Sequence, residues 1–133
     1  MGDKSLRVVC ADDNVLIADA MQQIIDLDPD MQCVGCFHNA DHLLDEMARL
    51  RPDVLVLDLK MPGRNPLDAL REMTAHLPEV RTIVCSGMDD RSSVRVAREA
   101  GAWGYVPKDG NVMAILQAIR RVAAGERALP IIN

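Results

Sequence analysis

The sequence lacks an apolar run that approaches the length of a membrane span, and its first five residues lack the apolar stretch of a secretory signal peptide. It also lacks an excess of basic residues. The net charge of −5 argues against a nucleic-acid-binding surface, which is usually basic. Internal repeats, low-complexity segments and interior linkers are absent too. With 133 residues, 49% of them hydrophobic, the chain is long enough to bury a core, so we expect one cytoplasmic globular domain.

The cysteines do not form a recognisable metal or redox site. Cys33 and Cys36 have CxxC spacing, but the sequence has no second such pair, and its three histidines lack ligand spacing. Because both cysteines fall in a predicted strand, we expect the odd separation to send their side chains to opposite faces. Together with Cys10 and Cys85, they are predicted to be reduced thiols in the core or near the surface.

Short apolar runs alternate along the chain with segments of helical periodicity. Asn14, Asn39 and Asn111 precede three of these helical segments, and Pro66 suits the first turn of another. The predicted strands are Leu6–Ala11, Met31–Cys36, Val54–Leu57, Thr82–Cys85 and Gly104–Val106. Five successive βα units predict an α/β fold, with a parallel sheet, right-handed crossovers and helices on both faces.

The first helical segment follows Asn14 and is rich in apolar residues. Leu16, Ile17, Ala20, Met21 and Ile24 recur at helical spacing, so we expect them to form the face that packs on the sheet.

Polar side chains follow four of the five predicted strands. Asp12 and Asp13 follow the first strand, Asp58 the third, Ser86 the fourth and Lys108 the fifth. The carboxyl ends of parallel strands share one edge of the sheet, where open α/β sheets bind their ligands, so these side chains can converge. Three carboxylates at one place repel one another unless a cation lies among them. The pattern therefore predicts a metal-assisted carboxylate site.

The same residues resemble the receiver domain of two-component response regulators, over about Leu6 to Gly125. The resemblance implies a flavodoxin-like (CheY-like) doubly wound five-stranded parallel sheet with strand order 2-1-3-4-5. Three segments are most similar to the NarL/LuxR subfamily, whose members usually carry a C-terminal helix-turn-helix domain: Met61-Pro62-Gly63, Gly104–Asp109 and Val122–Arg127. The motifs that carry it are Asp12-Asp13, Asp58 with Met61-Pro62-Gly63, Ser86-Gly87 and Gly104-Tyr105-Val106-Pro107-Lys108-Asp109.

The resemblance implies that Asp58 is the phosphoacceptor, a nucleophile that forms an acyl phosphate. Mg²⁺ is the implied cofactor, held by Asp13 and Asp58, by Asp12 through water and by the backbone carbonyl of Lys60. A hard cation that keeps several waters suits such a set of oxygen ligands.

The remaining implied roles concern the phosphoryl group and the switch. Lys108 would neutralise one phosphoryl oxygen, and the Ser86 hydroxyl would donate to another. Ser86 and Tyr105 would form the switch, in which the hydroxyl moves toward the phosphoryl group and the aromatic ring turns inward. Lys60 and Met88 occupy positions that tune the loss of the phosphoryl group, and we hypothesise that they make the phosphorylated state long-lived.

The implied organisation is a receiver domain over residues 1–125, with 126–133 as the start of a linker to an absent helix-turn-helix output domain. The expected partner is a sensor histidine kinase or phosphotransfer protein that docks near the first helix and the active-site loops. We also expect a homodimer on activation, contact with DNA only through the output domain, and no contact with a membrane.

The leading hypothesis is a self-catalysed phosphoacceptor with autodephosphorylation, and there are three alternatives to it. A pseudo-receiver would act only as an interaction module, although the intact acidic pair, Asp58 and Lys108 argue against that. A multiple-turnover hydrolase of the haloacid dehalogenase type needs Asp-x-Asp after its first strand, but Lys60 stands where the second acid would follow Asp58. A nucleotide-binding flavodoxin-like protein is disfavoured, because no predicted strand is followed by a glycine-rich phosphate loop.

Overall fold

Strands and helices alternate five times along the chain in the computed structural model, which describes residues 6–87, 91–109 and 111–130. The predicted alternation is therefore confirmed. No helix within these ranges has both the length and the apolar character needed to cross a membrane. In chain order the elements are β1 (Leu6–Ala11), α1 (Val15–Leu27), β2 (Met31–Phe37), α2 (Leu43–Leu50), β3 (Val54–Asp58), α3 (Pro66–His76), β4 (Arg81–Ser86), α4 (Arg91–Glu99), β5 (Gly104–Pro107) and α5 (Val112–Ala123).

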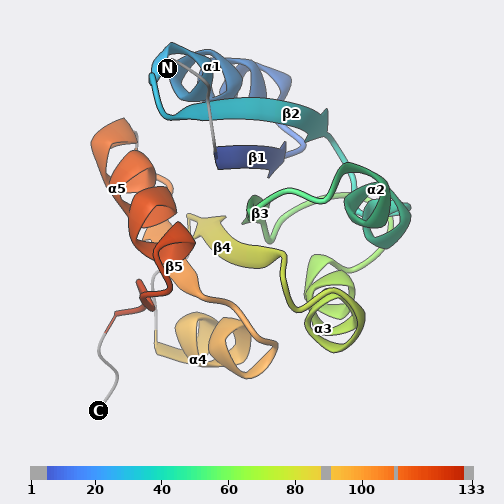
Figure 1. Ribbon diagram of the computed structural model, residues 1–133. Coiled ribbons are helices and arrows are strands. Elements are labelled where there is room, and N and C mark those ends of the chain that lie inside the picture. The colour runs from blue at the N-terminus through green and yellow to red at the C-terminus, as the bar shows by residue number, and fades with distance from the viewer. Residues whose placement is uncertain (1–5, 88–90, 110, 131–133) are drawn as a thin grey trace.

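The five strands form one parallel sheet in the order β2-β1-β3-β4-β5, the order that the resemblance to the receiver domain implies (Figure 1). The register aligns the carboxyl ends of the central strands, because Ala11 pairs with Leu57 and Asp58 pairs with Cys85. On the far side of β4, Ser86 pairs with Pro107. The residues that follow these strands therefore emerge along one edge of the sheet.

Two layers of helices cover the sheet (Figure 1). Helices α1 and α5 pack on one face, and α2, α3 and α4 pack on the other. The central strand β3 is buried along its whole length, which explains its uninterrupted apolar sequence. Its terminal residue Asp58 is therefore a carboxylate held at the margin of a fully apolar layer.

Most of the predicted helix boundaries agree with the structure. The Asn14 side chain accepts hydrogen bonds from the backbone N–H groups of α1, and Asn111 caps α5 in the same way. Pro66 opens α3. Asn39 differs, because its side chain accepts from the backbone N–H of Asp41 and forms a turn, while α2 begins only at Leu43.

The expectation that Cys33 and Cys36 point to opposite faces is wrong. The register of β2 against β1 shifts where Val8 pairs with Cys33 and the next residue, Val9, pairs with Gly35. This bulge inserts one residue, so both cysteines pack against the apolar cluster under α1 and α5. Cys10 belongs to that same cluster. All four cysteines are free thiols, as predicted.

The buried face of α1 agrees with the predicted one only in part. Ala18, Met21 and Ile25 are the buried residues of this helix, whereas Leu16 is 80% exposed and Ala20 is also exposed. Met21 is buried and Ile17 and Ile24 pack against the same apolar cluster, so the real face overlaps the predicted one and is shifted toward Ala18 and Ile25. Leu16 lies in the first turn of the helix, next to the strand-end acids.

Candidate functional site

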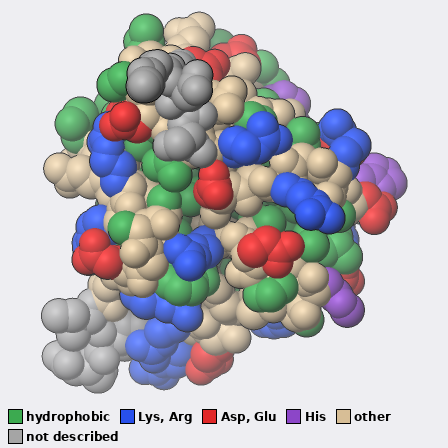
Figure 2. All heavy atoms as spheres, viewed as in Figure 1, with side chains coloured by type: hydrophobic (Ala, Val, Ile, Leu, Met, Phe, Trp, Pro, Cys, Tyr) green, Lys and Arg blue, Asp and Glu red, His purple; other side chains and the backbone are tan. Residues whose placement is uncertain are grey.

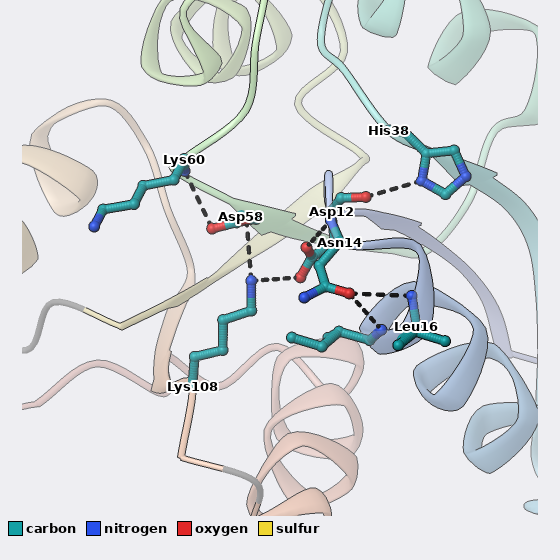
Figure 3. A network of polar contacts seen from close by, with 8 residues as sticks. Asp12, Asn14, Leu16, His38, Asp58, Lys60 and Lys108 are labelled. Atoms are coloured by element: carbon teal, nitrogen blue, oxygen red, sulfur yellow. Dashed lines mark hydrogen bonds and ion pairs between the residues drawn. The ribbon is translucent and has the colours of Figure 1, made fainter.

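Lys108 joins two of the strand-end carboxylates into one cluster (Figure 3). Asp12 follows β1, Asp58 ends β3, and Lys108 follows β5. The Lys108 Nζ atom lies 2.7 Å from Asp12 Oδ2 and 3.1 Å from Asp58 Oδ2. Both carboxylates are almost completely buried, at 2% and 3% exposure, so the lysine compensates charges that water reaches poorly.

The other oxygen of each carboxylate is held by the backbone. Asp58 Oδ1 accepts a hydrogen bond of 3.1 Å from the N–H of Lys60, and Asp12 Oδ1 accepts one of 2.9 Å from the N–H of Asn14. Both carboxylates are thus fixed in the same way, by a backbone N–H two residues on and by Lys108. The Lys60 side chain is exposed and extends away from the cluster (Figure 3).

Asp13 completes a group of three carboxylates that could hold a cation. One oxygen from each of Asp12, Asp13 and Asp58 lies within 4.8 Å of the other two. Asp13 is exposed while its two companions are buried, so the group opens toward solvent on one side. Hard oxygen donors with access to water fit Mg²⁺, which keeps several of its own waters. Three carboxylates face one ammonium group, so negative charge remains in excess at this edge.

The pKa values of the two central groups, Asp58 and Lys108, are both raised, but for different reasons. Burial raises the pKa of Asp58 above its usual range, although the Lys60 N–H and the Lys108 ammonium act in the opposite sense. Burial alone would lower the pKa of Lys108, but its hydrogen bonds to Asp12 and Asp58 outweigh this and raise the pKa. Lys108 is therefore a firmly charged cation beside a carboxylate whose ionised form is poorly solvated.

The predicted switch residues lie on β4 and β5. Ser86 ends β4, is 1% exposed, and accepts the backbone N–H of Lys108 on its carbonyl at 2.8 Å. The side chain of Tyr105 is buried, at 4% exposure, in the apolar cluster under α2, α3 and α4. The tyrosine ring therefore occupies an inward position. Met88 lies outside the described residues.

Two contacts at this edge were missed by the sequence reasoning. His38, directly after β2, donates from Nδ1 to the backbone carbonyl of Asp12 at 2.9 Å (Figure 3). Asp41 accepts the backbone N–H of Arg64 at 2.8 Å and lies against Gly63, whose φ of +80° favours glycine. Polar residues directly after the other four strands are the predicted site candidates, and the same criterion applied to β2 identifies His38. No local pattern marks Asp41, because its partner lies in the loop after β3.

Comparison with known proteins agrees with this arrangement. Residues 8–120 match the family model of the response regulator receiver domain. The chain is 32% identical to the nitrate/nitrite response regulator protein NarL of Escherichia coli over 122 residues, which cover 92% of this chain and 56% of that protein. It is 33% identical to a protein-glutamate methylesterase/protein-glutamine glutaminase of a Nocardioides species over 119 residues, which cover 88% of this chain and 32% of that protein. The chain thus spans about half or less of these curated relatives.

Solved structures show the same similarity. The signal receiver domain of the putative response regulator NarL from Mycobacterium tuberculosis superposes with a TM-score of 0.87 and 26% sequence identity. The match covers 93% of this chain and all of that one. The relatives share the receiver portion and differ in what accompanies it.

Proposed function

The chain belongs to the response regulator receiver domain family of two-component systems, and on that basis we propose that it accepts a phosphoryl group on Asp58. The donor is a phosphohistidine of a sensor kinase or phosphotransfer protein. In this step a bond forms between an Asp58 carboxylate oxygen and phosphorus, the phosphorus–nitrogen bond of the donor breaks, and the donor histidine leaves with the bonding electrons. The protein catalyses one transfer to itself and later hydrolysis of its own acyl phosphate, without turnover of a separate substrate.

The contact of Lys108 with both Asp12 and Asp58 is the observation that carries the proposal. Phosphoryl transfer needs positioning and neutralisation of charge more than covalent chemistry. The N–H of Lys60 orients the Asp58 carboxylate, and the Lys108 ammonium lies where it can shift onto a phosphoryl oxygen of the new acyl phosphate. Burial raises the pKa of Asp58, which makes its ionised oxygen a stronger nucleophile.

Asp12, Asp13 and Asp58 are the residues that would hold Mg²⁺, with the Lys60 carbonyl as a further ligand. When bound, Mg²⁺ supplies positive charge that reduces repulsion between the carboxylates and the incoming phosphoryl group. The Ser86 hydroxyl, at the end of β4, would donate to a second phosphoryl oxygen. Its movement would stabilise the inward position that Tyr105 occupies in this structure, and would so pass the change to β4 and β5.

The exposed start of α1 supports docking of the phosphodonor at this edge. Val15 and Leu16 are 52% and 80% exposed, directly after the acids of the site. Exposed apolar side chains beside a reactive group are typical of a protein-binding surface. A cytoplasmic kinase or phosphotransfer domain could contact these residues while its phosphohistidine reaches Asp58. The 30% identity over 127 residues to a DNA-binding transcriptional activator of Mycobacterium tuberculosis supports transcription as the output. We propose that this output requires a further domain and a homodimer formed on activation.

Intact mass spectrometry tests the proposal. The protein is incubated with acetyl phosphate, with and without Mg²⁺, beside Asp58→Asn and the exposed control Asp19→Asn. We expect one alkali-labile phosphoryl group, dependent on Mg²⁺, in the wild type and in Asp19→Asn but not in Asp58→Asn. No gain in mass by a folded protein would instead support the pseudo-receiver. Multiple turnover of a phosphomonoester would support the hydrolase.

The phosphoryl lifetime is tested separately with Lys60→Ala. Because the Lys60 ammonium extends away from Asp58 in this structure, a slower loss of phosphate requires the side chain to turn toward the phosphoryl group. An unchanged dephosphorylation rate in Lys60→Ala would remove the lysine from the hypothesis.

A further inference from the structure

The segment after α5 returns along the free edge of β5. The chain turns at Gly125, whose φ is +92°. The backbone N–H of Ala128 then donates to the carbonyl of Trp103 at 2.8 Å, and the N–H of Tyr105 donates to the carbonyl of Ala128 at 3.1 Å. Ala128 forms a parallel bridge with Gly104. The tail thus pairs with β5 in the manner of a short sixth strand.

Side chains reinforce this backbone pairing. The guanidinium of Arg127 stacks over the indole of Trp103 at 3.8 Å from the ring centroid and donates to the carbonyl of Ala102 at 3.2 Å. Arg81 of β4 also stacks over Trp103, at 4.5 Å, and donates to the Val122 carbonyl near the end of α5 at 2.9 Å. Such cation–π contacts stabilise by about 0.5–1 kcal/mol at exposed sites and more when desolvated. Figure 2 shows Lys and Arg side chains gathered at the lower left, where Figure 1 places α4 and the tail.

The tail also enters both apolar layers. Ala128 packs against the cluster under α1 and α5, and Leu129 packs against the cluster under α2, α3 and α4. The second cluster contains the Tyr105 side chain. Tyr105 is therefore linked to the tail by its backbone N–H and shares an apolar cluster with Leu129.

We infer that residues 127–129 form a latch on β5 that transmits the state of the phosphorylation site to the chain beyond it. This rests on the proposed function, because the latch responds to the position of Tyr105, the proposed switch residue. The contacts described here belong to the inward position of the tyrosine ring. Phosphorylation, by favouring that position, reinforces the latch and fixes the direction in which the following segment leaves the domain. By linkage, opening the latch disfavours the inward position to the same extent.

Amide hydrogen exchange of Tyr105 reports directly on the latch, because its N–H bonds to the tail. Arg127→Gln removes the cation of the tail that stacks over Trp103, and Ala128→Pro removes the N–H that donates to the Trp103 carbonyl. Arg95→Gln, at an exposed position on α4, is the matched control. We expect Tyr105 exchange to become roughly tenfold faster in both latch variants and to stay unchanged in the control. Unchanged exchange in both latch variants would overturn the latch.

Coupling to the site is tested by the same amide in the phosphorylated protein, with phosphoryl occupancy measured by intact mass. We expect exchange at Tyr105 and Ala128 to slow several-fold on phosphorylation and to stay constant in Asp58→Asn treated in the same way. Full occupancy without any change in these amides would overturn the coupling and leave the phosphoacceptor function standing. Failure to gain a phosphoryl group would overturn the proposed function, and the coupling with it.

Discussion

Lys108 Nζ lies 3.1 Å from Asp58 Oδ2, although 50 residues separate the two in the chain. The same ammonium lies 2.7 Å from Asp12 Oδ2, so one cation serves two buried carboxylates from different strands. This shared contact offsets part of the negative charge of the site before any phosphoryl group or metal is bound. It also makes the stability of the domain sensitive to each member of the cluster.

Lys108→Gln is expected to destabilise the folded protein at pH 7 by roughly 1–3 kcal/mol, because it leaves the two carboxylates without their cation. The pKa of Lys108 is raised by its partners, so its contribution is fully present at pH 7 and is lost only as the pH rises through that raised value. Urea unfolding measures the effect, with the exposed Lys60→Gln as control. Mg²⁺ should restore much of the loss. Equal stability of Lys108→Gln and wild type would contradict the shared-cation interpretation.

Asp58→Asn is expected to raise the melting temperature at pH 7 by a few degrees. Burial raises the pKa of Asp58 in the folded protein above its ordinary value of 3.8. Between these two pH values, Asp58 is therefore ionised in the unfolded chain but still protonated in the folded protein. Ionisation therefore favours unfolding at neutral pH, and the gain from asparagine should vanish as the pH falls below about 3.8. Thermal melts across this range, beside Asp19→Asn, measure it. If the rise in melting temperature did not depend on pH, it would not come from the charge of Asp58.

Mg²⁺ is expected to raise the melting temperature of the wild type, by an amount equivalent to about 2.7 kcal/mol at one hundred times its dissociation constant. Asp13→Asn should have nearly wild-type stability without Mg²⁺, because the residue is exposed, but should require a higher Mg²⁺ concentration for the same shift. Calorimetric titration provides the affinity. If Asp13→Asn bound Mg²⁺ as the wild type does, Asp13 would not be a ligand.

Cys33 is expected to react with iodoacetamide several-fold faster than Cys36 at neutral pH, although both are partly exposed. A hydrogen bond with Cys10 lowers the pKa of the Cys33 thiol, whereas burial raises the pKa of Cys36. Pulse alkylation with peptide mass mapping measures the two rates. Cys10→Ala should reduce the difference between the two alkylation rates. If the difference persisted in this variant, it would come from accessibility and not from the pKa of Cys33.

The strand ends were the most predictable part of the site. Asp12, Asp58 and Lys108 each interrupt or follow a run of buried apolar residues, and a parallel sheet brings such positions to one edge whatever their separation in sequence. The sequence pattern indicated the alternation of strands and helices, while the strand order came from the resemblance to the receiver family. The chemical roles of the site residues remain predictions, because proximity alone does not show phosphoryl transfer.

The features that sequence reasoning missed depend on tertiary contacts. The bulge in β2 places Cys33 and Cys36 on the same face. Apart from Gly35, no residue in the segment Cys33–Cys36 indicates a bulge. The pairing of Ala128 with Trp103 needs the whole of α5 to bring the tail back to β5. In α1, Leu16 satisfies the helical period yet is left in solvent, since periodicity does not say which of two apolar stripes meets the sheet.

The site draws its members from both ends of the chain, Asp12 from the first strand and Lys108 from beyond the last. During synthesis the acidic pair leaves the ribosome early, but the lysine emerges only when the domain is almost complete. Closing so long a loop is a late and slow event in folding. A nascent or partly folded chain therefore lacks the assembled site, so the phosphoryl transfer that we propose requires a domain in which Lys108 has already reached Asp12 and Asp58.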